Sequence, residues 1–281
     1  MSTGGNIPAA PPAPWLALGR TLLAQADTLR TYSDEPDCYT RTYLSAAHRQ
    51  AAAQIKTWMM EAGMRVREDA VGNVIGRLEN GDDHAPTIIT GSHFDTVRNG
   101  GRYDGVLGVI LPLAVAKKFH DAHRTLPFAL EVVAFADEEG VQFATSFLGS
   151  SAYVGAFDTA LLDRRDEQGV TLRDAALAAG LDIDKVNTDH RNFNHISGYV
   201  EVHIEQGPVL LNEGYPLGVV TAIAGASRYI VTITGEAGHA GTVPMPVRRC
   251  AGSGGGDGTG DRSGCCGQTC RAGRHRRQVS R

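Results

Sequence analysis

Three short stretches of the chain place imidazole or carboxylate groups directly after apolar, strand-like runs. The groups are His93, Asp95 and Asp104 in GSHFDTVRNGGRYDG, Glu138 and Glu139 in FADEEG, and His203 and Glu205 in VEVHIEQGP. Because ligands of open α/β sheets gather at the carboxyl edge of the strands, we expect the three stretches to converge in space. Imidazole and carboxylate groups bind first-row divalent metal ions, so their convergence predicts a metal site.

The residue types also suggest separate roles within such a site. The carboxylate of Asp104 is able to bridge two ions about 4 Å apart. Glu138 and Glu139 are consecutive and point in different directions, so that one binds metal while the other transfers protons. Asp95 lies two residues beyond His93, where we expect its carboxylate to accept the second imidazole N–H and fix the tautomer of the ring.

Each group also has an ordinary structural explanation. A histidine near a strand end is often just a hydrogen-bonded polar residue, and Asp104-Gly105 is typical of a turn or a helix cap. Glu138 and Glu139 are compatible with a solvated turn, and the HIEQG and GHAGT segments with a strand and a glycine-rich turn. The occurrence of such groups at three strand ends together favours the site over these separate explanations.

Apolar periodicity and turn residues indicate an α/β arrangement around these stretches. The patterns predict helices at 15–29, 45–63 and 104–123, and strands within 64–80, 86–90, 128–137 and 198–208. Ser45 is the expected N-cap and Gly63 the end of the second helix, while Gly72-Asn73 forms a turn between two strands. Thr171 and Asp174 form a capping box for a further helix. After about residue 217 the helices give way to two β-rich runs, which indicates a separate module.

The composition indicates a soluble globular protein of one large domain or two smaller ones. The 281 residues are 42% hydrophobic and carry a formal net charge of −4. This charge gives no reason to expect a nucleic-acid or membrane partner, and no apolar run approaches the roughly 20 residues of a membrane span. The N-terminal 14 residues lack the features of a secretory signal and are interpreted as a flexible lead-in, so we expect a cytoplasmic protein.

Four blocks resemble one family of enzymes: GSHFDTVRNGGRYDG, FADEEGVQF, VEVHIEQGP and GEAGHAGTVPM. They are similar to the signature blocks of the allantoate amidohydrolase, N-carbamoyl-L-amino-acid hydrolase and β-ureidopropionase group within the M20-type dinuclear metallohydrolases. The similarity runs from about Ala26 to Arg249. It implies a mixed-sheet, helix-flanked catalytic domain at 15–216 and the beginning of a small α+β lid domain at 217–249, which forms a homodimer in this group.

The resemblance also implies roles for individual residues. The implied ligands of two divalent ions (Zn, Mn, Co or Ni) are His93, Asp104 and His203 at the first ion, and the bridging Asp104 with Glu139 at the second. Glu138 matches the general base, His239 reaches over the substrate from the lid domain, and Gln206 lines the site. The implied substrate is a small ureido or carbamoyl acid. Allantoate is favoured, and an N-carbamoyl-L-amino acid or β-ureidopropionate is the alternative.

The last 32 residues do not fit this family. Residues 250–281 are rich in glycine and arginine and contain four of the five cysteines. Two alternatives are a disordered basic arm and a zinc knuckle of Cys265, Cys266, Cys270 and His275, but the missing Cys-x-x-Cys pattern makes the knuckle unconvincing. A shift of reading frame is the favoured interpretation, because codons exist for which a one-base shift restores a strand and an amphipathic helix.

This interpretation predicts a one-base insertion or deletion near the codon for Cys250. Compared with the family, the chain then lacks the rest of the lid, a histidine of the second metal site and the residues that hold the substrate carboxylate. We therefore expect an incomplete second metal site and little or no activity, and an inactive fragment is the second alternative for function. Sequencing the gene tests the idea, and an intact frame that matches related genes would contradict it.

Overall fold

The computed structural model describes residues 13–82, 84–223 and 225. Residues up to Gly214 form one compact unit, and the chain from Tyr215 belongs to a second. The helices of the first unit are α1 (Ala13–Thr31), α2 (Ala46–Glu61), α3 (Val106–Asp121), α4 (Leu148–Tyr153), α5 (Leu172–Ala178) and α6 (Val209–Glu213), with 3₁₀ turns at Thr159–Asp163 and Ile183–Lys185. Its strands are β1 (Arg65–Glu68), β2 (Val74–Leu78), β3 (Thr87–His93), β4 (Ala129–Phe135) and β5 (Ile196–Val200).

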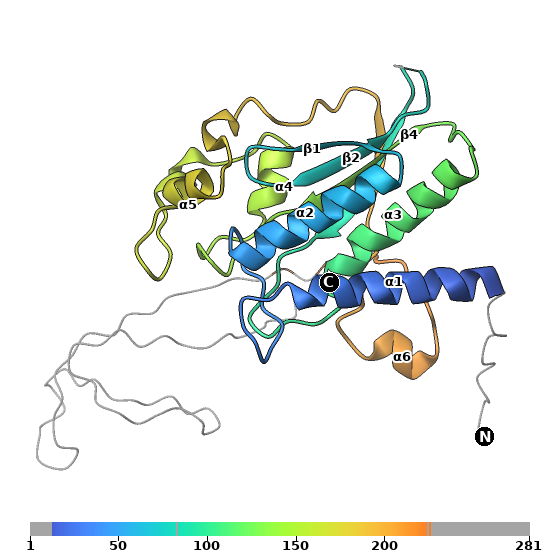
Figure 1. Ribbon diagram of the computed structural model, residues 1–281, viewed down its shortest axis with the longest axis horizontal. Helices are drawn as coiled ribbons and strands as arrows, with labels where there is room; N and C mark the ends of the chain where they lie inside the picture. Colours follow the sequence, from blue (N-terminus) through green and yellow to red (C-terminus); the bar gives the residue numbers. More distant parts are fainter. Residues whose placement is uncertain (1–12, 83, 224, 226–281) are drawn as a thin grey trace, which may run out of the picture. The chain divides into compact units, whose positions relative to one another are not determined.

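The five strands form one mixed sheet in the order β1-β2-β4-β3-β5. β1, β2 and β4 pair antiparallel, whereas β3 pairs parallel with both β4 and β5. Figure 1 shows α2 and α3 across one face of this sheet, where α2 packs on β1 and β2, and α3 packs on β3 and β4. α1 packs in turn on α3. The sheet and its helices confirm the predicted mixed α/β class.

Local signals in the sequence explain where the elements begin and end. The Ser45 side chain accepts a hydrogen bond from the His48 N–H at the start of α2, and Gly63 follows the helix with a φ of 75°. Gly72 has a φ of 88° in the turn between β1 and β2. Thr171 caps α5 by accepting from the Asp174 N–H. These predicted boundaries are confirmed, because each depends on contacts within a few residues.

The prediction of a third buried strand at 198–208 is wrong in its extent and its burial. β5 ends at Val200, three residues before His203, and its side chains are half-buried or exposed. Among the described strands it pairs with β3 alone and so lies at the edge of the sheet. Of the run GYVEVHI, only 198–200 therefore belongs to a strand, and an edge position buries less of that strand than a central one would.

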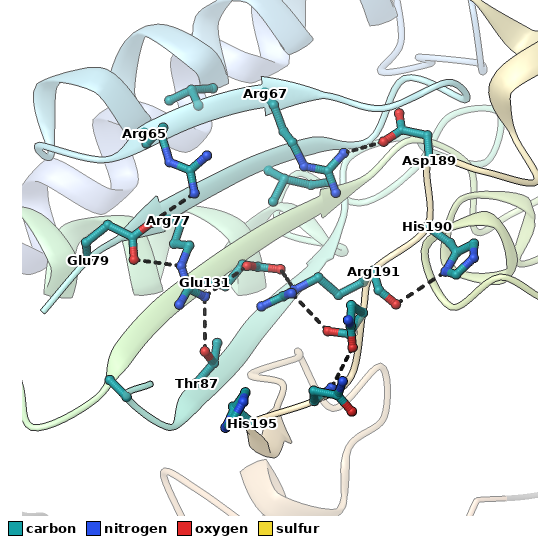
Figure 2. A pocket seen from close by; sticks show the side chains of 15 residues that line it. Arg65, Arg67, Arg77, Glu79, Thr87, Glu131, Asp189, His190, Arg191 and His195 are labelled. Atoms are coloured by element: carbon teal, nitrogen blue, oxygen red, sulfur yellow. Dashed lines mark hydrogen bonds and ion pairs between the residues drawn. The ribbon is translucent and has the colours of Figure 1, made fainter. Parts of the chain in front are cut away.

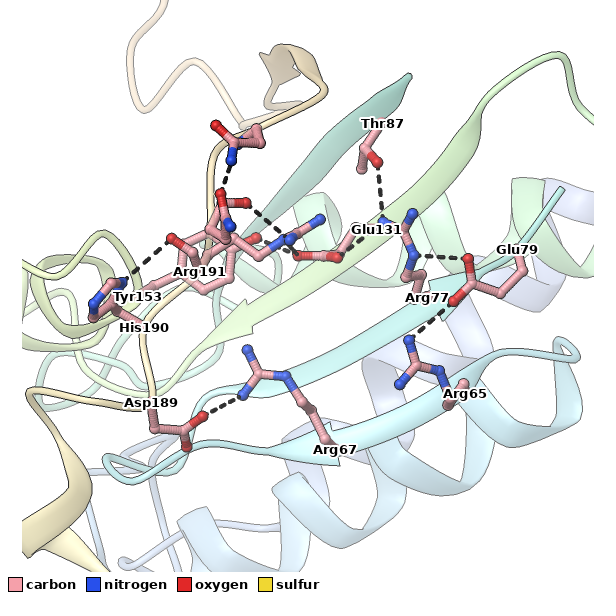
Figure 3. Close-up of polar contacts among 12 residues, drawn as sticks. Arg65, Arg67, Arg77, Glu79, Thr87, Glu131, Tyr153, Asp189, His190 and Arg191 are labelled. Carbon is pink, nitrogen blue, oxygen red and sulfur yellow. Dashed lines mark hydrogen bonds and ion pairs between the residues drawn. The ribbon is translucent and has the colours of Figure 1, made fainter. Parts of the chain in front are cut away.

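The face of the sheet opposite α2 and α3 carries a buried carboxylate. Glu131 in β4 is 3% exposed and accepts hydrogen bonds from Arg77, Arg191 and the hydroxyl of Tyr153. Figure 3 shows these side chains meeting above β2 and β4. Burial and the Glu131 charge raise the pKa of Tyr153, so this hydroxyl remains a donor. The network ties the segment before β5 to the centre of the sheet.

The predicted lid segment and tail lie almost entirely outside the described residues. Only 217–223 and Gly225 of the lid segment are described, and nothing of 250–281. In the described part of the chain, no helix is long and apolar enough to cross a bilayer. The lead-in is described only from Ala13, where α1 begins two residues earlier than predicted.

A glycine at the centre of the sheet allows β3 and β4 to pair closely. Gly91 has a φ of 153°, and a Cβ added there would lie 1.9 Å from the main-chain oxygen of Val133. A side chain at this position would therefore force the two strands apart. Gly198 in β5 has no heavy atom within 4 Å of an added Cβ and offers a matched comparison.

We predict that Gly91→Ala lowers the free energy of unfolding by about 3 kcal/mol, because overpacking and backbone strain act together. Gly198→Ala is expected to change it by no more than about 0.5 kcal/mol. Urea denaturation followed by circular dichroism measures both. Equal midpoints for the two variants would show that the β3–β4 approach does not constrain the fold.

Candidate functional site

The parallel pairing of β3 and β4 brings two of the predicted segments together. His93, the last residue of β3, is in register with Phe135, the last residue of β4. The Phe94 N–H continues the pairing by donating to the Phe135 oxygen at 3.1 Å. Segments 93–95 and 136–139 therefore leave the carboxyl edge of the sheet side by side.

One group of side chains that could hold a metal ion consists of His93, Asp104 and His203, whose ligand atoms lie within 4.8 Å of one another. The Asp104 Oδ1 atom is 3.3 Å from Nε2 of His203 and 3.9 Å from Nε2 of His93. The two rings stack with their centroids 5.9 Å apart. Two histidines that are 110 residues apart in sequence thus face one carboxylate.

Two glycines make this close approach possible. Gly105 has a φ of 66°, and a Cβ there would lie 2.5 Å from Nε2 and from the main-chain oxygen of His93. Gly108, in the first turn of α3, would place a Cβ 2.4 Å from the oxygen of Val202. The first brings Asp104 to His93, and the second brings the segment that carries His203 against α3.

A second such group consists of His93, Glu138 and Glu139. The carboxylate of Asp95 positions these two glutamates, since its oxygens accept the N–H groups of Glu138 and Glu139 at 3.0 and 3.1 Å. The neighbouring Asp137 accepts the Gly140 N–H at 3.1 Å and closes the turn. Hydrogen bonds to the main chain, rather than the side chains themselves, thus fix where the two glutamates stand.

Asp95 also contacts His93, but in a different way from the one predicted. The Nδ1 atom of His93 lies 3.0 Å from the main-chain oxygen of Asp95 and 3.4 Å from its carboxylate. The imidazole N–H is therefore held chiefly by the main chain, and the carboxylate is occupied by the 138–139 turn. Either way Nδ1 carries the proton, and Nε2 is left to face Asp104.

The charges of the site are not balanced among the residues that the structure describes. Burial raises the pKa of Glu139 to about 7, and the charge of Glu138 adds to this effect. Burial also raises the pKa of Glu138. Burial opposes a charged His93, but the Asp95 carboxylate outweighs it and raises the pKa of His93 to about 9. These described groups therefore have too little positive charge around them, and they bind protons more readily than usual.

These features fit a divalent cation. The Asp104 Oδ1 atom is buried and has no hydrogen-bond partner within the described residues, although it is surrounded by imidazole nitrogens. A buried carboxylate oxygen without a partner is costly, and a cation would satisfy it. The donor set of imidazole and carboxylate groups suits Zn, Mn, Co and Ni.

The remaining predicted residues have different surroundings. Gln206 donates from Nε2 to the Asp104 Oδ2 atom at 2.7 Å and so borders the first group. Glu205 instead accepts the N–H groups of Val209 and Leu210 at the start of α6, and it belongs to neither group. His239 lies outside the described residues.

A buried arginine, not predicted from the sequence, lies below the site. Arg41 is 0% exposed; its Nε donates to the Phe94 oxygen at 2.6 Å, and its main-chain N–H donates to the Thr96 hydroxyl at 2.8 Å. It thereby supports the segment that follows β3 and places a cation close to Asp95. No periodicity marks this residue, because it lies in an irregular segment before α2.

A cavity of about 660 Å³ lies away from these groups, over the opposite face of the sheet. Figure 2 shows it lined by Arg65, Arg67, Arg77 and Arg191 among other residues. Each arginine pairs with a carboxylate of Glu79, Glu131 or Asp189. The cavity is thus part of the Glu131 network, and the groups at the strand ends are the better candidate site.

The chain is similar in sequence to a family model and to several curated proteins. The model of Peptidase family M28 matches residues 73–206. Allantoate deiminase 1 of Glycine max is 42% identical over 231 residues, which cover 81% of this chain and 48% of the relative. N-carbamoyl-L-amino-acid amidohydrolase of Pseudomonas sp. (strain NS671) is 41% identical over 211 residues, covering 74% and 51%. The chain thus spans about half the length of the curated relatives it matches.

The solved structures agree with these relatives. The crystal structure of AtUAH in complex with (S)-hydroxyglycine superposes with a TM-score of 0.72 at 34% identity, covering 82% of this chain and 56% of that one. A hydantoinase/carbamoylase family amidase from Burkholderia vietnamiensis also has a TM-score of 0.72, at 33% identity and a coverage of 82% and 55%.

We predict that Asp95→Ala lowers the free energy of unfolding by about 3 kcal/mol, because two N–H groups of the 138–139 turn lose a buried, charged acceptor. Asp158→Ala is the matched control, since Asp158 caps an exposed 3₁₀ turn by accepting one N–H. Its loss is expected to cost about 1 kcal/mol. Denaturation curves of the two variants test this, and equal losses would contradict the positioning role of Asp95.

Proposed function

Because the chain belongs to the family of allantoate deiminases and N-carbamoyl-L-amino-acid amidohydrolases, we propose that it carries out metal-dependent hydrolysis of a ureido or carbamoyl C–N bond. The family membership confirms the resemblance found in the four sequence blocks. Allantoate is the favoured substrate, and an N-carbamoyl-L-amino acid or β-ureidopropionate is the alternative. Relatives at about 40% identity carry both kinds of name, which supports the bond type more strongly than the substrate.

The observation that carries the proposal is the meeting of His93, Asp104 and His203 with the two glutamates at one sheet edge. In the proposed site the first three hold one divalent ion, and Asp104 with Glu139 holds a second. A divalent cation bound there would polarise the substrate carbonyl and would increase the acidity of a nearby water molecule. The orphaned Oδ1 of Asp104 and the clustered carboxylates support this assignment.

The chain's own residues then move the proton. Glu138 takes a proton from the attacking water, whose oxygen forms a bond to the carbonyl carbon. Glu138 returns the proton to the nitrogen as the C–N bond breaks, so that ammonia leaves. The carbamate formed from a carbamoyl group then loses carbon dioxide. Asp95 holds the main chain of Glu138 during both transfers.

Gln206 and His239 are proposed to contact the substrate. Residues 15–216 are proposed as the catalytic domain and 217–249 as the start of a lid domain that dimerises, in a cytoplasmic protein. The second candidate is an inactive fragment of such an enzyme, in which the expected loss of the C-terminal part of the site leaves metal binding by the same ligand groups without hydrolysis.

The test is to load the purified chain with Mn²⁺, Co²⁺ or Zn²⁺ and to measure bound metal and ammonia release from allantoate and from N-carbamoyl-L-amino acids. Glu138→Gln is expected to lower kcat by about 100-fold or more while metal content is unchanged, because it removes only the proton carrier. Asp104→Asn is expected to weaken metal binding by more than about 100-fold, since even outer contacts to a metal ligand account for 10- to 100-fold.

Glu167→Gln is the matched control, because Glu167 is an exposed carboxylate paired with Arg98 away from both ligand groups. It is expected to retain both metal and any activity. Bound metal without ammonia from any of these substrates would favour metal binding alone. A chain that binds none of the three ions would overturn the metal-dependent mechanism.

A further inference from the structure

A buried histidine lies beneath both ligand-bearing segments and takes no part in either metal group. His48, in the first turn of α2, is 0% exposed. Its ring stacks on Phe94, with 4.4 Å between centroids and 19° between planes. Its Nε2 atom lies 2.7 Å from the main-chain oxygen of Ala136. One side chain thus contacts the residue after His93 and the residue before the 137–139 turn.

The contact with Ala136 occurs where the sheet can no longer hold the chain. The pairing of β4 with β2 and β3 ends by Phe135. The next peptide groups are satisfied by side chains instead: the Ala136 N–H donates to Asn73 at 2.9 Å, and the Ala136 oxygen accepts from His48. Buried main-chain groups require such partners, so these two side chains determine the direction in which the chain leaves β4.

The protonation state of His48 agrees with this geometry. A carbonyl oxygen only accepts, so Nε2 carries the hydrogen, and the buried Nδ1 atom has no partner in the described part of the chain. Burial lowers the pKa of His48 to about 4, which keeps the ring neutral. A neutral ring stacks on Phe94 without a charge to solvate and still offers one strong donor.

We propose that His48 is a positioning residue that sets the spacing between segments 93–95 and 136–139, and with it the distance from His93 to Glu138 and Glu139. Phe94 fixes the first segment through ring stacking, and the Ala136 oxygen fixes the second through a hydrogen bond. Both contacts are made by the same imidazole ring, so a movement of one segment disturbs the other. Its catalytic consequence rests on the proposed function, but the positional claim does not.

Two variants of His48 separate its hydrogen bond from its ring stacking, and a third variant is a control. His48→Phe keeps an aromatic ring and removes the donor, whereas His48→Gln retains an N–H near the place of Nε2 without the ring. Ile55→Val is the control, because Ile55 is a buried residue of the same helix that touches neither segment through a hydrogen bond. It reports the effect of a simple loss of packing in α2.

The first measurement is amide hydrogen exchange at Glu138 and Glu139, whose N–H groups bond to Asp95. The second is Co²⁺ affinity. Relative to Ile55→Val, His48→Phe is expected to lower the exchange protection of these two amides, and also the Co²⁺ affinity, by about tenfold or more, as for other contacts that orient metal ligands. His48→Gln is expected to recover most of the exchange protection. If His48→Phe fails to fold, His48→Ala removes the donor without overpacking.

Equal exchange protection in His48→Phe and Ile55→Val would overturn the proposal, because the histidine would then be an ordinary core residue. The exchange measurement needs neither metal nor substrate. If the unaltered chain binds no Co²⁺, the metal proposal fails while exchange still decides the role of His48. If Co²⁺ binds but exchange is unaffected by His48→Phe, only the positioning role fails.

Discussion

The parallel pairing of β3 with β4 is the interaction on which the candidate site depends. Because His93 pairs in register with Phe135, both strands end at the same level. The segments that follow them therefore leave the sheet side by side. The close spacing of the strands at Gly91 and the buried core between the sheet and helices α2 and α3 fix the position of these strand ends. An antiparallel pair would have sent the 93–95 and 136–139 segments to opposite edges of the sheet.

Beyond the ends of the strands, order is maintained by side chains that bond to the main chain. Asp95 holds the 138–139 turn, Arg41 holds the Phe94 oxygen, and Asn73 holds the Ala136 N–H. Loops built in this way keep polar groups satisfied without a strand partner. The candidate ligands therefore stand on a rigid base, although each of them lies outside regular secondary structure or at its last residue.

Much of this arrangement is predictable from the sequence, because it is encoded locally. Caps such as Ser45 and turns such as Gly72 act within a few positions, so the starts of α2 and α5 and the turn between β1 and β2 are predicted correctly. Apolar runs followed by polar residues likewise indicate β3 and β4. The shortness of β5 and the true acceptor of the His93 N–H were not predicted, because they depend on which strand is at the edge and on how the 138–139 turn competes for Asp95. The roles of Arg41 and His48 were not predicted for the same reason, because the burial of a polar residue depends on residues that are distant in sequence.

His93 belongs to both groups of potential ligands, and this has a consequence for how they fill. Its Nδ1 is engaged by Asp95, which leaves a single lone pair on Nε2. One lone pair serves one cation, so the two groups are competitors for His93 rather than independent compartments. Among the described residues, the second ion of the proposed site would then take its ligands from the carboxylates alone, and it would bind more weakly than the first.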